Sequence, residues 1–263
     1  MKPGETFETK CYTYLKNSYR NKGTEFYKEG GMNSTKSDIA VVKNGQITFY
    51  IEAKDSHAQS GQFVLIPNEE TETFVFSPRN RSTPNEMTDM IIAYMNRSFH
   101  KFNNAGTAGE SLSIDNTIFA QWIVDYYKSK NVKYVISYGG NFVIFPIRKF
   151  KDYFQISATY RIKKSGSDKP AKRDFGIVKQ EIINSYPTAT FSVDGQKLFA
   201  RISEPLSKDR FPLGKYTYYF SRQSANLFEI RRLSNTYNMN VIFSIDLIKS
   251  QDVNDLNEFE ADI

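Results

Sequence analysis

The sequence contains very few of the side chains on which several common kinds of site depend. There is one cysteine, Cys11, and there are two histidines, His57 and His100, among 263 residues. A single cysteine excludes an internal disulfide framework and any zinc site built from several cysteines. Two histidines exclude a histidine-rich metal cage and leave few candidates for a histidine-based catalytic triad. Catalysis, if there is any, must therefore depend mainly on carboxylates and lysines.

Long apolar runs are missing as well. No segment approaches the roughly 18–20 consecutive apolar residues that a membrane-spanning helix needs. The residues that follow Met1 include no apolar stretch typical of a secretory signal. We therefore expect a cytoplasmic protein with no membrane partner, and we expect no organic cofactor.

Acidic residues are fewer than basic ones, and the imbalance is local. The chain has 35 Lys and Arg against 29 Asp and Glu, a formal net charge of +6, which is compatible with a nucleic-acid partner. Between Arg148 and Arg173, basic residues far outnumber acidic ones. Beyond Lys249 the charged residues are all acidic, and we expect this end of the chain to be frayed.

Apolar periodicity predicts an α/β or α+β protein. Helical spacing favours helices over residues 4–20, 84–99, 117–129 and 175–185, and alternating patterns favour strands over 24–28, 37–43, 46–54, 133–138, 142–146 and 155–162. Further strands are expected between 188 and 245. This order predicts a core with a mixed sheet, followed by a β-rich second half. We place a first region at 1–145 and a basic, strand-rich second region at 146–263, with one continuous domain as the alternative.

The segment 37–54 is the most informative part of the sequence. Its odd positions from 39 to 53 are mostly apolar, while Asp38, Glu52 and Lys54 fall on even positions. A plain two-residue loop at Asn44-Gly45 would pair odd with even positions, so we expect a type I turn with Gly45 as a bulge. In that register the two carboxylates and the lysine project from one face of the hairpin. Asp55 would point to the opposite face.

This arrangement has two interpretations. Two neighbouring carboxylates repel each other unless a divalent cation lies between them, and Mg²⁺ accepts one or two carboxylates together with water and phosphate oxygens. The lysine could then orient a water molecule or stabilise negative charge. Alternatively, Asp38 caps a strand and Glu52 and Lys54 belong to a solvated face.

The motif Ser37-Asp38 followed by Glu52-Ala53-Lys54 resembles that of the PD-(D/E)xK nucleases, with serine where that family often has proline. The segment Gly4-Glu5-Thr6-Phe7-Glu8 resembles the family's G-x-x-F-E helix, and the order of elements resembles its αβββαβ core. Within the superfamily, the size and the basic second half look most like a type II restriction endonuclease.

The resemblance implies hydrolysis of phosphodiester bonds in double-stranded DNA at a specific sequence. It implies Mg²⁺ as the cofactor, with Mn²⁺ as a substitute, and a homodimer as the default assembly. Asp38 and Glu52 would be metal ligands, Lys54 would position the water, and Glu8 would be a further ligand, with Glu5 as its alternative. Two other functions stay open: a repair or junction-resolving nuclease on the same core, and a non-catalytic DNA-binding module.

Two groups of residues in the second half are candidates for DNA contact. The first is a basic loop that could clamp phosphates or simply be solvated, and it contains Lys163, Lys164, Lys169, Lys172 and Arg173. The second has side chains able to read base edges, namely Arg222, Gln223 and Asn226, with Arg231 beyond them. His57 and Gln62, just after the lysine, could touch substrate or lie in a solvated loop.

Overall fold

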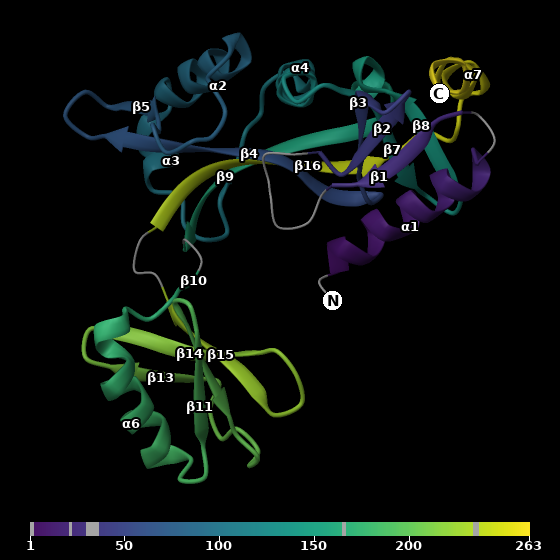
Figure 1. Cartoon of the computed structure of the whole chain (residues 1–263). Helices are drawn as coiled ribbons and strands as arrows, with labels where there is room; N and C mark the ends of the chain where they lie inside the picture. Colours follow the sequence, from purple (N-terminus) through teal and green to yellow (C-terminus); the bar gives the residue numbers. More distant parts are fainter. Residues whose placement is uncertain (1–2, 21–22, 30–36, 165–166, 234–236) are drawn as a thin grey trace. The chain divides into compact units, whose positions relative to one another are not determined.

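The computed structural model describes residues 3–20, 23–29, 37–164, 167–233 and 237–263. The chain forms two compact units, one made of residues 1–162 and 239–263 and the other of residues 163–238 (Figure 1). These limits differ from a division at residue 145. Strand β9 (Phe154–Lys164) and strand β16 (Tyr237–Leu247) supply neighbouring strands of a sheet in the first unit, so the C-terminal segment belongs with the N-terminal one.

The first sheet has the order β1-β2-β3-β7-β8. Its strands are β1 (Glu25–Lys28), β2 (Ile39–Lys43), β3 (Gln46–Ala53), β7 (Val132–Tyr138) and β8 (Phe142–Pro146). Strands β3 and β7 run parallel, and the other neighbours run antiparallel. The predicted mixed sheet is confirmed. A parallel pair needs a long crossover, and here the crossover contains helix α4 (Asn116–Lys128).

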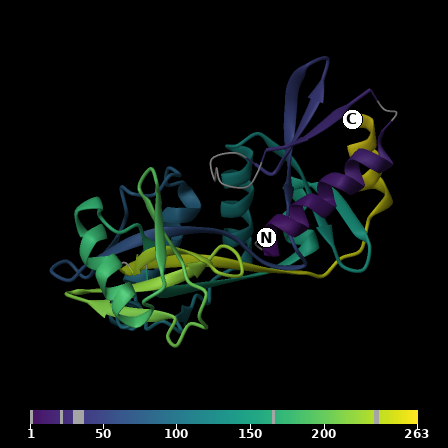
Figure 2. The ribbon, with the colours of Figure 1, turned by 60° about the horizontal axis from the view of Figure 1, so that its bottom comes forward.

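The apolar face of this sheet packs against helix α1 (Pro3–Ser18). Cys11 and Leu15 of α1 are fully buried against Ile39, Val41 and Ile51, the odd positions of the hairpin. Helix α7 (Val253–Asp262) completes this core through Phe259, whose ring centroid lies 5.3 Å from that of Tyr19. Figure 2 shows α7 beside the C-terminal end of α1. The even positions face the other side of the sheet.

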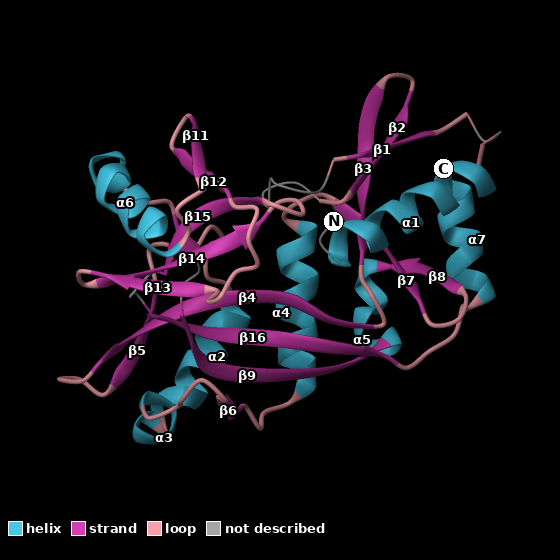
Figure 3. Cartoon of the chain, turned by 90° about the horizontal axis from the view of Figure 1, so that it is seen from below, coloured by secondary structure: helices cyan, strands magenta, loops and turns pink. Residues whose placement is uncertain are grey.

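A second sheet of the same unit has the order β5-β4-β16-β9-β6. Its remaining strands are β4 (His57–Asn68), β5 (Thr73–Phe76) and β6 (Glu110–Ser111). Helices α2 (Glu86–Asn96), α3 (Phe99–Asn103) and α4 pack on it, and the short η1 (Ile147–Lys149) and α5 (Phe150–Tyr153) lead into β9. Figure 3 shows β4, β16 and β9 running alongside one another. Because α4 touches both sheets, their cores are continuous on its side.

His57 and Gln62 lie on β4 and not in a solvated loop. The start of this strand is polar and gives no apolar alternation, but β16 pairs with it from His57 to Leu65. Gly61 has φ of +109°, and a β-carbon there would lie 2.7 Å from Trp122 of α4. This glycine therefore lets β4 approach the helix.

The second unit contains a sheet with the order β11-β12-β15-β14-β13, with β10 also pairing to β15. Its strands are β10 (Ser167–Asp168), β11 (Thr190–Asp194), β12 (Lys197–Arg201), β13 (Arg210–Leu213), β14 (Tyr216–Arg222) and β15 (Leu227–Leu233). After the short η2 (Lys172–Asp174), helix α6 (Phe175–Ser185) covers the sheet through Val178 and Ile182. The predicted β-rich character of this region is confirmed.

The acidic C-terminal end is an ordered helix, so the expectation of a frayed end is wrong. Leu256, Phe259 and Ile263 recur at helical spacing and pack into the first core. The acidic residues on the other faces have basic or phenolic partners. Asp255 is 1% exposed and accepts hydrogen bonds from Lys149 Nζ at 2.5 Å and Tyr153 Oη at 2.7 Å.

Replacing Phe259 with alanine should therefore destabilise the protein by about 3–5 kcal/mol, because it empties a fully buried ring site. Urea unfolding followed by circular dichroism would measure the loss. Asn257→Ala, on the exposed face of the same helix, should change stability by less than about 0.5 kcal/mol. Equal effects of the two substitutions would show that α7 does not belong to the core.

Candidate active site

The β2–β3 hairpin has a different turn from the one expected. Asn44 and Gly45 have φ of 51° and 75°, and Lys43 pairs directly with Gln46, so the loop is the plain two-residue one. A type I turn with a bulge at Gly45 is therefore wrong, although Gly45 does have the predicted positive φ. The register is corrected further along the strands. Val42 pairs with Ile47 and Val41 with Phe49, which leaves Thr48 as the extra residue in β3.

The bulge at Thr48 restores the pairing of even with even positions. Thr48 Oγ1 donates a hydrogen bond to the carbonyl oxygen of Val41 at 3.0 Å. Beyond it Ala40 pairs with Tyr50 and Ile39 with Ile51. Continued by one residue, this register sets Asp38 opposite Glu52. The side chains expected on one face are therefore brought together, by a different bulge.

Asp38, Glu52 and Lys54 are each held by a hydrogen bond. The backbone N–H of Ala53 donates to Asp38 Oδ2 at 2.9 Å, and Lys54 Nζ donates to Glu52 Oε1 at 2.7 Å. Glu52 is 7% exposed, and the side chain of Lys54 is 15% exposed. An ion pair this deeply buried is held in one geometry and is screened little by salt.

Burial and neighbouring charges shift the pKa values of both Asp38 and Lys54. Desolvation raises the pKa of Asp38 to about 7, and the negative charge of Glu52 acts in the same direction, while Lys54 and the Ala53 N–H act against it. Burial by itself would lower the pKa of Lys54. The carboxylate of Glu52, the phenol of Tyr127 and the carboxylate of Asp38 outweigh burial and raise that pKa well above its ordinary value. Lys54 is therefore a charged ammonium, and Asp38 exchanges its proton near neutrality.

The raised pKa of Asp38 predicts a pH-dependent stability. Between its ordinary value of 3.8 and about 7, the folded protein holds this proton while the unfolded chain has lost it, so the native state is penalised as pH rises through that window. Asp38→Asn should therefore be more stable than the wild type at pH 8, by at most about 4 kcal/mol, with no gain at pH 4. Urea unfolding in EDTA at both pH values would test this.

Asp152→Asn is the matched control, because Asp152 is exposed on α5. This variant removes an exposed carboxyl and should not reproduce the pH-dependent gain of Asp38→Asn. A gain for Asp38→Asn that is the same at pH 4 and pH 8 would contradict the assigned pKa.

Glu8 of α1 lies beside this group. It lines a cavity of about 330 Å³ together with Asp38, Lys54 and Asp55. Its Oε2 is buried and has no hydrogen-bond partner, and its nearest cation is Lys28 Nζ at 3.8 Å. Asp55 was expected on the opposite face, but β3 ends at Ala53, so strand alternation no longer governs its direction. The side chain of Glu5 lies outside the described residues.

The oxygen donors fit a hard divalent cation. Within the described part of the chain, no group of three or more His, Cys, Asp and Glu side chains is close enough to hold a metal. Asp38 and Glu52 could supply two ligands, and water or substrate oxygens would supply the others. That ligand set is the one Mg²⁺ prefers. The buried oxygen of Glu8, which has no hydrogen-bond partner, and the proton-binding carboxyl of Asp38 are both groups that a nearby cation would stabilise.

Tyr127 of α4 is a further residue of the site, and it was not among the residues predicted from the sequence. The Nζ of Lys54 lies 5.4 Å from the centroid of its ring, and its hydroxyl lies 3.5 Å from Ser60 Oγ. Tyr127 is 3% exposed, and Ser60 is fully buried. The only signal in the sequence is the apolar stripe of the helix, which marks a core residue but not its contact with Lys54.

The basic segment expected as a loop is partly regular. Lys169 follows β10, and Lys172 and Arg173 are exposed in η2. The side chains of Lys163 and Lys164 lie outside the described residues.

The second group of candidates is only partly gathered in one place. Arg222 is the last residue of β14, and Gln223 and Asn226 lie in the connection to β15, where Arg222 donates to the carbonyl of Ala225 at 2.7 Å. Arg231 lies on β15 instead, paired with Glu229 at 3.0 Å and with the carbonyl of Ser167 at 2.7 Å. Its guanidinium is therefore committed to contacts within this unit.

Among the described residues, no helix is long and apolar enough to cross a membrane. No protein-family model matches the chain. Nor does a comparison with curated proteins give a match.

One solved structure is similar over nearly the whole chain. It is HhaI endonuclease in complex with DNA, which shares 39% sequence identity with this chain. The similarity covers 98% of this chain and 97% of the other, with a TM-score of 0.84. The α+β fold inferred from the sequence is that of this endonuclease. At this identity and coverage, the chain belongs to the family of HhaI endonuclease.

Proposed function

We propose that the protein is a Mg²⁺-dependent endodeoxyribonuclease that hydrolyses double-stranded DNA at a specific sequence, as a type II restriction enzyme does. The observation that carries the proposal is the convergence of Asp38, Glu52 and Lys54 at the end of β3. Membership of the HhaI endonuclease family supports it, since that relative is an endonuclease solved with DNA. The motif residues thus lie together in a fold that this chain shares with an endonuclease solved with DNA.

Each side chain has a distinct role in this proposal. Mg²⁺ held by Asp38 and Glu52 would neutralise charge on the scissile phosphate and favour ionisation of water, and Mn²⁺ would substitute for it. The Ala53 N–H holds the Asp38 carboxylate in position. Glu52 fixes the ammonium of Lys54, which donates a hydrogen bond to the attacking water and orients it toward phosphorus. Glu8, expected as a further metal ligand, lines the same cavity but forms no three-carboxylate metal group with Asp38 and Glu52 among the described residues.

Digestion of plasmid and phage DNA with and without Mg²⁺, followed by run-off sequencing of the ends, tests the proposal. Discrete ends at one repeated sequence would support it. Cleavage only at branched or damaged DNA would point to a repair nuclease, and binding without cleavage would point to a DNA-binding module. Mg²⁺ should also raise the melting temperature of the wild type but not of Asp38→Asn, because only the intact pair binds the ion.

The assembly and the DNA contacts of the second half stay predictions. Sedimentation with a cognate duplex would decide whether the active species is a homodimer. Lys169, Lys172 and Arg173 are still candidates for phosphate contact, and Arg222, Gln223 and Asn226 for base contact.

Tyr127 should act as a positioning residue for Lys54. Tyr127→Leu removes the ring below the ammonium and should lower kcat about tenfold, the equivalent of a desolvated cation–π contact of about 1–2 kcal/mol. Tyr127→Phe keeps the ring and should stay within about threefold of the wild type. Single-turnover cleavage rates and KM for DNA would be measured for both.

A purely structural role would make a different prediction. Both variants would then lose stability and activity in the same proportion, and Phe would not rescue the rate. The expected signature is a fall in kcat with little change in KM for Leu alone.

A further inference from the structure

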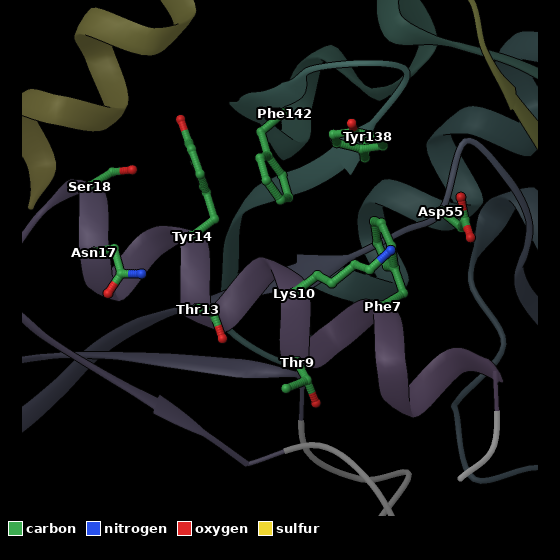
Figure 4. Close-up of a pocket in the computed structure, with 10 residues that line it drawn as sticks. All are labelled: Phe7, Thr9, Lys10, Thr13, Tyr14, Asn17, Ser18, Asp55, Tyr138 and Phe142. Atoms are coloured by element: carbon green, nitrogen blue, oxygen red, sulfur yellow. The ribbon is translucent and has the colours of Figure 1, made fainter.

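A groove of about 690 Å³ lies between helix α1 and the turn that joins β7 to β8 (Figure 4). One wall is the exposed face of α1, and the other contains Tyr138 and Phe142. No part of the catalytic proposal uses these residues.

The groove adjoins the candidate active site. Phe7 and Asp55 line both this groove and the cavity that contains Asp38 and Lys54. The groove along α1 is therefore the immediate neighbour of the catalytic cavity on that side. No linker or second unit is involved, because every lining residue belongs to the first unit.

The walls combine polar donors with apolar rings. Lys10, Thr13 and Asn17 follow one another along the groove side of α1 at spacings of three and four residues. Across from them, the ring of Phe142 stacks on Tyr14 at 4.0 Å and meets Tyr138 edge-on at 5.1 Å, and Tyr138 remains 43% exposed. Such a surface suits a ligand whose charged and apolar parts alternate.

Lys10 has a charge available for a ligand. It is exposed, and among the described residues no acidic group pairs with it. Lys16, on another face of the same helix, lies over the ring of Tyr12 at 5.7 Å and does not line the groove.

We propose that this groove binds the sugar–phosphate backbone of the cleaved DNA strand beside the scissile bond, with Lys10 on a backbone phosphate. The inference rests on the proposed nuclease function and deepens it. Thr13 and Asn17 donate hydrogen bonds to phosphate oxygens, and the rings of Tyr138 and Phe142 cover deoxyribose. From Lys10 to Asn17 the helix rises about 10 Å, which equals the rise of about three base-pair steps along the axis of a duplex. The contact therefore extends at most about three nucleotides to one side of the cut.

A second copy of the chain is the competing occupant. It would have to offer an acid to Lys10 and polar groups to Thr13 and Asn17, whereas a DNA strand that reaches the active site supplies phosphates there already. Continuity with the catalytic cavity therefore favours DNA.

The test compares Lys10→Ala with Lys16→Ala, which removes the same charge from another face of the same helix. Binding to a cognate duplex would be measured as a function of salt, and cleavage would be measured on the same duplex. Lys10→Ala should weaken binding about 5–10-fold and reduce the slope of log K against log salt by about one. Lys16→Ala should match the wild type in both.

Neutral methylphosphonate linkages provide the second measurement. Each would be placed singly at the three positions on either side of the scissile phosphate. One or more positions on one side should weaken binding by the wild type, and the same substitution should not weaken Lys10→Ala further, because the contact is already absent.

The outcomes separate this inference from the function on which it rests. If the wild type cleaves DNA while Lys10→Ala and Lys16→Ala bind alike, the groove is not a DNA site and the nuclease function stands. A change in sedimentation for Lys10→Ala without a change in DNA binding would assign the groove to a second copy. A wild type that neither binds nor cleaves DNA would overturn both.

Discussion

Glu52→Gln should reduce the rate of DNA cleavage by about a thousandfold or more. The amide keeps the shape of the side chain but loses the charge that binds a divalent cation, and it gives up the ion pair with Lys54 Nζ at 2.7 Å. DNA affinity without Mg²⁺ should stay within about threefold of the wild type or increase, because one negative charge near the phosphates is removed. Single-turnover cleavage and equilibrium binding would separate the two effects.

Glu25→Gln is the matched control, since Glu25 lies on the exposed edge strand β1 of the same sheet. It should cleave DNA at the wild-type rate. A Glu52→Gln protein that keeps more than about a tenth of the wild-type rate, or a wild type that is equally active in EDTA, would exclude the proposed metal mechanism.

The face that carries the candidate site could be predicted because burial imposes a strict alternation. Ile39, Val41 and Ile51 are completely buried, and a shift of one residue would have exposed all of them while burying Asp38. The apolar pattern therefore determines which side chains share a face, whatever turn joins the strands. That these residues perform the chemistry stays a prediction.

The position of the bulge could not be predicted in the same way. Asn44 and Gly45 both adopt positive φ, which the two-residue hairpin loop favours. The extra residue then falls at Thr48, four positions beyond Asn44. The local pattern is equally compatible with a bulge at Gly45 or at Thr48. Pairing with β7 on the other side of β3, which is also irregular between Tyr50 and Ile51, is a contact that a single strand cannot reveal.

The C-terminal helix and strand β4 were missed for a related reason. The charge of Asp255 suggested a solvated end, yet its partner Lys149 lies 106 residues earlier in the chain. The polar start of β4 acquires its strand character from β16, far away in sequence. Both elements are specified by tertiary contacts that override local composition.

Replacing Lys54 with methionine should lower kcat about 10²–10⁴-fold, the range expected when a group that positions or exchanges protons with the attacking water is lost. Methionine has a similar length and fills the pocket beside Tyr127, so the fold should be retained. Asp38 and Glu52 keep their carboxylates, and Mg²⁺ should therefore still raise the melting temperature. Without the ammonium, which lowers the pKa of Asp38, this Mg²⁺ effect should need a higher pH than in the wild type.

Lys130→Met is the matched control for this substitution. Lys130 lies just beyond α4 with its Nζ 4.2 Å from the ring centroid of Tyr126, so the change removes a similar lysine–tyrosine contact away from the cavity. It should cleave DNA normally. If Lys54→Met loses Mg²⁺ stabilisation as completely as Glu52→Gln, the lysine serves mainly to hold Glu52 in place. If it instead keeps Mg²⁺ binding and loses only kcat, the ammonium acts on the reacting water and not on the metal site.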